Sequence, residues 1–352
     1  MKVLVATDAW HPQINGVVNT LKALQRHAPA LGAEIVFVTP DGFRTFGLPT
    51  YPGLRCAVPS RRVIEARIDD IAPDAIHIAT EGPIGLMVRS ICLRRGLQFT
   101  TSFTTRFAEY ASARFPVPLS WGYALMRRFH EPAAATMVST PSLMAELTAR
   151  GFAPLRIWSR GVDTDLFHPD RAAPVDLPRP IFVSVGRVAV EKNLEAFLSL
   201  DLPGTKVIIG HGPQEDELRQ RYPDAVFLGT LTGEALARQV ASSDVFVFPS
   251  LTDTFGIVQL EALASGVPVA AFPVTGPRDV IGDAPVGALD YDLRKACLTA
   301  LTMSREACRR HALGYSWSNS ARQFLSNVVP AVATASVPSS SKPVPAAAHS
   351  VG

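Results

Sequence analysis

The sequence predicts an α/β protein made of two doubly wound parallel-sheet domains that face a cleft. Short apolar runs alternate with segments of helical periodicity along most of the 352 residues, and each run is apolar at successive positions. Strands of this kind are covered by helices on both faces, as in parallel sheets. A proline-rich break divides the pattern into two series, so we expect two open sheets that bind ligands at the carboxyl ends of their strands.

The first series defines an N-terminal domain over residues 1–170. An apolar run at 3–6 leads into a helical segment at 16–31 whose apolar residues share one face. Further strands of this sheet are expected at residues 35–38, 75–78, 99–103, 136–139 and 156–159. A helix at 316–329 is a candidate to complete this domain from the other end of the chain.

The second series begins after a linker at residues 171–180. The stretch 167–180 holds four prolines and no periodicity, which is typical of a connection between domains. The C-terminal domain follows at 181–315, with strands expected at residues 181–185, 206–209, 225–228, 245–248 and 267–271. Residues 330–352 have one Lys, no acidic residue and no Phe, Trp or Tyr, so we expect a disordered tail there.

Composition excludes several classes of protein. No run of about 18 uncharged apolar residues occurs, so we expect no transmembrane helix. The N-terminal segment lacks the pattern of a secretory signal, which favours a cytoplasmic location. None of the four cysteines belongs to a CxxC pair, so neither a disulfide framework nor a zinc site is expected.

Charge is spread unevenly between the two halves. The formal net charge is +3; residues 1–170 contain 18 Lys and Arg against 14 Asp and Glu, whereas the rest contains 16 against 17. This excess is too small for a nucleic-acid binder, and no stripe of aromatic and basic residues accompanies it. Gathered on one face of the N-terminal domain, it could favour an anionic membrane surface or a phosphate ligand.

The segment 249–278 holds the most informative motif. A turn containing Asp253 follows an apolar run and opens a helix that carries Glu261. Backbone N–H groups at such a helix start can receive hydroxyls or an anion. Asp253 and Glu261 are placed to address one elongated ligand; the alternative is an ordinary helix with a solvated Glu.

Two further motifs suit a phosphate ligand. Arg187 and Lys192 flank a turn between a strand and a helix, and two cations beside a helix start can bind a diphosphate, although such residues are often plain surface charges. The third motif is the glycine turn at Gly16, which opens the first helix without a GxGxxG pattern. A backbone without a Cβ there allows close approach of a phosphate.

Together these segments resemble the retaining glycosyltransferases of family four, which have the two-Rossmann-domain architecture called GT-B. The resemblance extends to about residue 325 and includes the Gly16 loop, SRGVDTDLF, GRVAVEKN, IIGHGPQEDEL and the pattern PSxxDTFG with Glu261. The stretches PDAIHIATEGPIG and 249–277 look most like the branch that contains sulfoquinovosyl, glucosyl and glucuronosyl diacylglycerol synthases and lipid-directed mannosyltransferases.

The resemblance implies a role for each matching position. Glu261 would bind the ribose hydroxyls of a nucleotide sugar. Arg187 and Lys192 would hold its diphosphate and neutralise the leaving group. Asp253, where the family usually has Glu, would grip the sugar. The other donor contacts implied by the resemblance are Gly16 at the phosphate, Phe255 and Gly256 at the sugar, and Gly212, Thr230 and Leu231 beside the nucleobase.

The acceptor side departs from the family pattern. Many relatives carry His at the strand end where this chain has Thr104, in TTSFTTRF. Thr104 and Arg106 are candidates to replace it, and in retaining transfer a leaving phosphate oxygen can itself accept the acceptor proton. His77, at another strand end, suits a structural role as well as a functional one. Glu81 is the better candidate for lining the acceptor site.

Two DxD triplets, at residues 163–165 and 290–292, could suggest a metal site. We assign both to turns and helix capping, so no metal and no other cofactor is expected.

The segment 118–132 places apolar residues at helical spacing beside Trp121, Arg127 and Arg128. It suits an interfacial helix or, equally, a helix that packs its apolar stripe on the sheet. The basic residues that could extend this face are Arg61, Arg62, Arg89, Arg94 and Arg95.

The leading hypothesis is a peripheral glycosyltransferase on the cytoplasmic face of the cell membrane. It would move a hexose or uronic acid from a UDP-sugar, UDP-glucose or UDP-glucuronate, to a diacylglycerol-type lipid. One alternative keeps the mechanism with GDP-mannose as the donor or a soluble glycan as the acceptor. Another is a non-catalytic protein that binds nucleotide sugars at a membrane.

Overall fold

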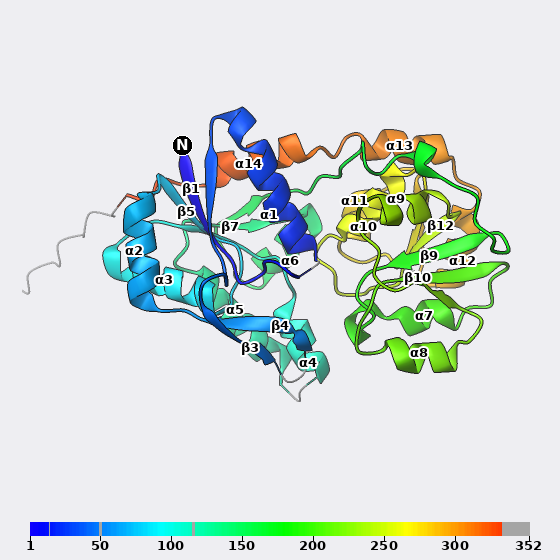
Figure 1. Ribbon diagram of the computed structural model, residues 1–352, viewed down its shortest axis with the longest axis horizontal. Helices are drawn as coiled ribbons and strands as arrows, with labels where there is room; N and C mark the ends of the chain where they lie inside the picture. The colour runs from blue at the N-terminus through cyan, green and yellow to red at the C-terminus, as the bar shows by residue number, and fades with distance from the viewer. Residues whose placement is uncertain (14, 49–50, 115–116, 333–352) are drawn as a thin grey trace, which may run out of the picture.

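The computed structural model describes residues 1–13, 15–48, 51–114 and 117–332, and it contains two α/β domains side by side (Figure 1). The predicted doubly wound fold is confirmed. The N-terminal sheet has six parallel strands in the order β2-β1-β5-β6-β7-β8. Their bounds are β1 Lys2–Ala6, β2 Glu34–Val38, β5 Ala75–Ile78, β6 Thr100–Ser102, β7 Ala135–Val138 and β8 Leu155–Ile157.

The C-terminal sheet also has six parallel strands, in the order β11-β10-β9-β12-β13-β14. The order reverses between β9 and β12, and open sheets bind ligands in the crevice at such a reversal. The bounds are β9 Ile181–Val185, β10 Thr205–Ile209, β11 Val226–Phe227, β12 Val245–Phe248, β13 Val269–Ala271 and β14 Gly287–Leu289.

Helices cover both faces of each sheet (Figure 1). In the N-terminal domain they are α1 Gly16–His27, α2 Arg61–Ile71, α3 Pro83–Arg95, α4 Phe107–Arg114, α5 Leu119–His130 and α6 Pro141–Ala149, with the 3₁₀ turn η1 Pro29–Leu31. In the C-terminal part they are α7 Leu194–Leu198, α8 Glu215–Arg221, α9 Gly233–Ala241, α10 Ile257–Ala264, α11 Pro277–Ile281, α12 Leu293–Ala300 and α13 Arg305–Ala312, with η2 Pro169–Arg171 and η3 Val190–Lys192.

Strand β9 shows why the apolar runs are continuous. Phe182 points to one face, where it packs with Phe197 of α7, and Val183 points to the other, where it packs with Leu260 of α10. Because successive strand residues face opposite sides, a strand covered on both sides needs apolar residues at every position. The low charge content of the chain follows from two such sheets.

Helix α14, Trp317–Asn327, returns to the N-terminal domain and lies beside α1 (Figure 1). Its Phe324 packs with Val3 and Leu21 in the core of that domain. The two crossings between the domains run together, because Val162 forms a β-bridge with Ser316. Helix α14 thus stabilises the N-terminal domain from the far side of the C-terminal domain in the sequence.

The end of the chain differs from the expectation. The first residues of the predicted tail are bound to the N-terminal domain. The Ala331 amide donates to the carbonyl of Asp74, which directly precedes β5, at 2.8 Å. The rest of the tail predicted as disordered, residues 333–352, lies outside the described residues.

An antiparallel hairpin was not predicted from the sequence. It consists of β3 Arg44–Leu48 and β4 Tyr51–Val58. The Pro and Gly residues at positions 52 and 53 interrupt its apolar pattern, and both residue types are depleted in strands.

Among the described residues, no helix has the length and apolar character needed to cross a bilayer.

Candidate active site

The loops after β9 and β12 meet at the reversal point of the C-terminal sheet. A small pocket lies between them, and its lining includes Gly186, Arg187, Lys192, Phe248 and Pro249. The two loops are also hydrogen-bonded to each other, since Ser250 Oγ donates to the Glu191 carbonyl at 3.0 Å. Two of the sequence motifs therefore form one crevice at the place where such sheets bind ligands.

Lys192 and Asp253, predicted from different motifs, form an ion pair in this crevice. Lys192 Nζ lies 2.8 Å from Oδ1 and 2.7 Å from Oδ2 of Asp253. The lysine side chain is 25% exposed and the aspartate side chain 17% exposed, so the pair is accessible from the crevice. Arg187 is exposed on the turn that follows β9. The site therefore offers a fixed cation beside a carboxylate.

Glu261 lies in the second turn of α10, behind the Asp253 loop, and is partly buried. Burial raises its pKa to about 7. Within the described chain, no hydrogen bond or ion pair engages its carboxylate, which leaves the oxygens able to accept hydroxyl groups. The helix begins after Gly256, whose φ of +80° and close approach to the Phe248 ring leave no room for a Cβ.

The third motif, Gly16, lies in the N-terminal domain and approaches the helix that follows the Asp253 loop. A Cβ on Gly16 would lie 3.5 Å from Ile257 Cδ1, so the start of α1 faces the start of α10. Asn15 caps α1 by accepting from the amides of Val17 and Val18, both at 3.0 Å. Two helix N-termini from different domains thus lie close together, and their partial positive charges favour an anion between them.

Gly212, Thr230 and Leu231 follow β10 and β11 on the same edge of the sheet. A Cβ on Gly212 would collide with the Val188 carbonyl, so glycine is required for the packing of the loops. Thr230 is exposed, whereas Leu231 packs partly against the core. Phe255 is buried beneath the Asp253 loop. Gly212, Thr230 and Leu231 thus lie on the same carboxyl edge as the crevice without lining it, and the buried side chain of Phe255 packs into the core.

The residues expected on the acceptor side have partners inside the protein. His77 is fully buried, with Nδ1 2.9 Å from Thr100 Oγ1 and Nε2 2.8 Å from Ser102 Oγ. Burial lowers its pKa to about 3, so His77 is a neutral structural residue. Glu81 Oε1 lies 3.2 Å from His130 Nε2, a partner that the sequence did not indicate. Its other oxygen is buried and has no partner among the described residues.

Arg106 does not line the cleft, contrary to the expectation. Its guanidinium binds Glu146 at 2.9 and 2.7 Å and Glu109 at 2.8 Å, and its side chain is 7% exposed. Two carboxylates from α4 and α6 therefore hold it as a structural cation. The Thr104 carbonyl accepts from Thr254 Oγ1 at 3.0 Å, while the Thr104 hydroxyl is buried and has no partner in the described part of the chain.

Some residues near the site carry no recognisable motif. Thr254 and Ser139 form hydrogen bonds between the domains, and the Ser142 amide donates to Asp279 at 2.9 Å. Tyr110 of α4 is also near this site. Burial raises its pKa, and the negative charge of the neighbouring Asp253 raises it further. Thr254 could have been found from the sequence, because it stands between Asp253 and Phe255 of the PSxxDTFG pattern. No sequence pattern marks Ser139, Ser142 or Tyr110.

The DxD carboxylates serve local structure. Asp163 Oδ1 accepts from the amides of Asp165 and Leu166 at 3.2 and 3.0 Å. Asp290 pairs with Lys295 at 2.6 Å, and Asp292 caps α12. Over the ranges that the structure describes, no group of three or more His, Cys, Asp or Glu residues could hold a metal ion.

Helix α5 divides its apolar residues between the core and the surface. Tyr123, Met126 and Phe129 are buried, as the packing alternative requires, whereas Trp121 and Leu125 are 71% and 70% exposed. The basic face expected beside it is reduced by ion pairs. Arg94 binds Glu65 and Arg95 binds Asp69 between α2 and α3.

Comparison with known proteins agrees with this geometry. Residues 14–166 match the profile "Glycosyltransferase Family 4" and residues 179–301 match "Glycosyl transferases group 1". The chain is 31% identical to a GDP-mannose-dependent alpha-mannosyltransferase of Mycobacterium tuberculosis, over 90% of this chain and 93% of the relative. It is 30% identical to a sulfoquinovosyl transferase of Arabidopsis thaliana, over 79% of this chain and 60% of that protein.

A solved structure shares the fold. Sucrose-phosphate synthase from Thermosynechococcus elongatus superimposes with a TM-score of 0.74 at 18% identity, covering 92% of this chain and 97% of that one. The fold and the sequence relatives lead to the same family. The chain belongs to the glycosyltransferases of family 4 and is an enzyme of that class with the GT-B fold.

Proposed function

We propose that the enzyme transfers mannose from GDP-mannose to a lipid acceptor, with retention of configuration. The observation that carries the transfer chemistry is the Lys192 and Asp253 pair in the crevice, with Glu261 on the following helix. The choice of donor is supported by the relative that is named as GDP-mannose-dependent and covers nearly the whole chain. The UDP-sugar donor expected from the sequence becomes the second candidate.

Each residue has a defined part in this mechanism. Lys192 and Arg187 bind the diphosphate, Glu261 accepts hydrogen bonds from the ribose hydroxyls, and Asp253 binds the sugar. The acceptor oxygen forms a bond to the anomeric carbon as the bond from that carbon to the phosphate oxygen breaks. The acceptor proton passes to the departing phosphate oxygen, and nucleoside diphosphate leaves. Cations fixed beside the developing negative charge supply the largest catalytic effect.

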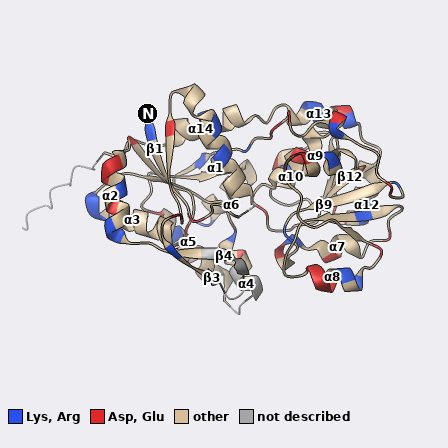
Figure 2. Cartoon of the chain, in the orientation of Figure 1, with Lys and Arg blue, Asp and Glu red and all other residues tan. Residues whose placement is uncertain are grey.

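A membrane acceptor is supported by the surface of α5. Trp121 and Leu125 are exposed apolar residues, and the neighbouring Arg127 and Arg128 are exposed cations. Figure 2 shows Lys and Arg positions along α2 and near α5, with Asp and Glu positions among those of α2. A helix with exposed aromatic, aliphatic and basic residues suits the interface of an anionic membrane. A diacylglycerol-type lipid remains the proposed acceptor, and a soluble glycan is the alternative.

A donor screen tests this proposal. The enzyme is incubated with a lipid extract and GDP-mannose, UDP-glucose or UDP-glucuronate, and the lipid products are detected by mass spectrometry. We expect a hexosyl lipid with GDP-mannose. Thermal stabilisation by GDP but not UDP would agree, because a ligand stabilises the fold that binds it. A product only with a UDP-sugar would replace GDP-mannose, and product only with soluble glycans would exclude the lipid.

Vesicle binding tests the membrane surface separately. The enzyme should sediment with phosphatidylglycerol vesicles and not with phosphatidylcholine vesicles. A Trp121→Ser, Leu125→Ser variant should lose this binding. Leu313→Ser is a matched control, because Leu313 is also an exposed leucine, at 53%, but lies on the other domain. Equal binding by all three proteins would contradict a role of α5 at the membrane.

A further inference from the structure

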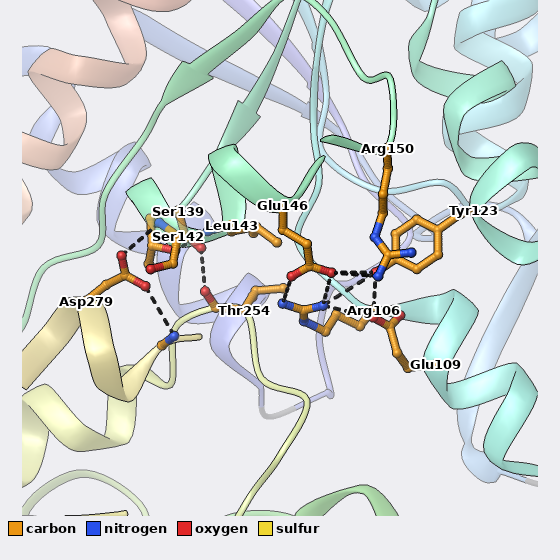
Figure 3. Close-up of polar contacts among 12 residues, drawn as sticks. Arg106, Glu109, Tyr123, Ser139, Ser142, Leu143, Glu146, Arg150, Thr254 and Asp279 are labelled. Carbon is orange, nitrogen blue, oxygen red and sulfur yellow. Dashed lines mark hydrogen bonds and ion pairs between the residues drawn. The ribbon is translucent and has the colours of Figure 1, made fainter. Parts of the chain in front are cut away.

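Thr254, in the loop that carries Asp253, is hydrogen-bonded to the opposite domain through both its side chain and its carbonyl. Thr254 Oγ1 donates to the Thr104 carbonyl at 3.0 Å, and Ser139 Oγ donates to the Thr254 carbonyl at 2.8 Å (Figure 3). Thr104 follows β6 and Ser139 follows β7, so both partners lie at the carboxyl edge of the N-terminal sheet. One residue of the donor loop thus has its side chain and its carbonyl held by the N-terminal domain.

A second contact supports the first from the adjacent turn. Asp279 of α11 accepts from the Ser142 amide, at the start of α6, at 2.9 Å. Its other oxygen accepts from the Gly276 amide at 3.4 Å. A Cβ on Gly276 would lie 2.9 Å from the Phe255 carbonyl, so this turn packs directly on the donor loop. The two contacts between the domains are therefore neighbours on the C-terminal side.

The N-terminal side of the contact is held together by the Arg106 ion pairs. Arg106 comes two residues after Thr104, and Glu146 belongs to α6, the helix that follows Ser139. Their two hydrogen bonds, at 2.9 and 2.7 Å, join the segment after β6 to the helix after β7 (Figure 3). The partners of Thr254 are consequently fixed relative to each other, and they present one preformed surface to the donor loop.

We propose that Thr254 is a positioning residue that couples docking of the two domains to the geometry of the donor site. Thr254 directly follows Asp253, which is paired with Lys192, so fixing Thr254 fixes the backbone beside that pair. Transfer then requires the N-terminal domain to be docked on the loop, whereas the nucleotide is bound mainly by Arg187, Lys192 and Glu261 of the C-terminal domain. The inference rests on the proposed function only in placing a nucleotide sugar beside Lys192 and Asp253.

The test compares two threonines of the same loop. Thr254→Val removes the hydroxyl that reaches Thr104, and Thr254→Ser retains it. Thr252→Val is the matched control, because the Thr252 hydroxyl is buried and has no partner among the described residues. We expect Thr254→Val to lower kcat about fivefold, the effect of one lost hydrogen bond, while Kd for GDP and UDP stays within about twofold. Thr254→Ser should restore kcat, and Thr252→Val should match the native enzyme.

A second measurement needs no turnover. The radius of gyration of the nucleotide-free enzyme in solution should increase in Thr254→Val and in Ser139→Ala, and should stay unchanged in Thr252→Val. Ser139→Ala acts from the other domain, so it tests the contact even if Thr254→Val does not fold. Unchanged kcat and radius in both contact variants would overturn the proposal, as would parallel losses of kcat, nucleotide affinity and thermal stability. If no donor gives product, the proposed function is wrong. The radius of gyration then tests the role of Thr254 independently of transfer.

Discussion

The carboxyl edges of the two sheets use their polar residues differently. On the C-terminal edge, Lys192 lines the crevice and is paired with Asp253, and the carboxylate of Glu261 on the following helix has no partner in the described chain. On the N-terminal edge, His77 and Arg106 bind residues of their own domain. A polar residue after a strand is therefore available to a ligand where it stays accessible, as the paired Lys192 and Asp253 do, and not where it is buried among internal partners, as His77 and Arg106 are.

The largest expected effect comes from removing the cation of the C-terminal edge. Lys192→Ala leaves the diphosphate with one fewer fixed charge, so kcat/KM should fall by about a thousandfold. The free energy of unfolding should change little, because the ion pair is partly exposed. Steady-state kinetics with the active donor and urea denaturation measure the two quantities.

The control for Lys192 is another Lys and Asp pair of the same domain. Lys295 lies 2.6 Å from Asp290 and is exposed. Lys295→Ala should therefore keep kcat/KM within about twofold of the native value, since an exposed pair contributes little. Equal losses in the two variants would mean that general charge, rather than the crevice, determines activity.

The N-terminal edge should show the opposite behaviour. Arg106→Ala leaves Glu109 without its cation and Glu146 with only the more exposed Arg150, in a largely buried place, so the free energy of unfolding should fall by roughly 3 kcal/mol. GDP affinity of the folded protein should not change, because Arg106 is bound within the N-terminal domain and does not line the crevice. Urea denaturation and calorimetric titration give these two values.

Two further variants test the origin of that loss. Arg106→Met combined with Glu109→Leu and Glu146→Leu should recover much of the stability, because an apolar replacement of a buried ionic cluster is often neutral. Arg310→Ala, in an exposed pair with Glu306, should cost less than about 0.5 kcal/mol. A loss of GDP affinity with intact stability in Arg106→Ala would return Arg106 to the ligand site.

Glu261 gives a pH-dependent difference between the edges. Burial raises its pKa to about 7 from the ordinary 4.5. The native state thus keeps a proton that the unfolded state has lost, and stability falls as pH rises from about 4.5 to 7. Ribose hydroxyls donate best to the ionised form, so GDP affinity should rise from about pH 6 to pH 8, by up to about tenfold.

The isosteric variant Glu261→Gln separates this effect from titration of the nucleotide itself. Its GDP affinity should be lower at about pH 8 and should change with pH only as far as the phosphate groups require. Isothermal titration calorimetry at several pH values provides the comparison. The same pH profile for Glu261→Gln and the native protein would exclude an ionised Glu261 from binding.

The sequence predicted elements that local pattern determines. The run 181–185 matches β9 because every residue of a two-sided strand is apolar. By contrast, β14 was missed, because Gly287 and Ala288 carry too little apolar surface to mark a strand. The same limit applied to the hairpin at β3 and β4, whose pattern is broken by Pro and Gly.

The candidate site was predictable only where a short segment contains its own chemistry. The cations of 187–192 and the acids of 253–261 stand in such segments. The partners of Arg106, His77 and Thr254 are 40, 23 and 150 residues away in the chain, and no local pattern specifies a contact of that separation. Internal pairing and burial, which together decide whether a polar residue is accessible to a ligand, are properties of the fold.

The smallest effects are expected at the DxD triplets. One forms a turn beside the crossing between the domains, and the other precedes and caps α12. Asp163→Asn keeps an oxygen that can accept from the Asp165 and Leu166 amides, so its structural role survives. Asp290→Asn loses only an exposed ion pair. Both variants should retain kcat/KM within about twofold, and addition of EDTA should not alter transfer by the native enzyme. Because a cation bound by these carboxylates would make transfer sensitive to both changes, joint loss of activity in a variant and in EDTA would establish a metal requirement.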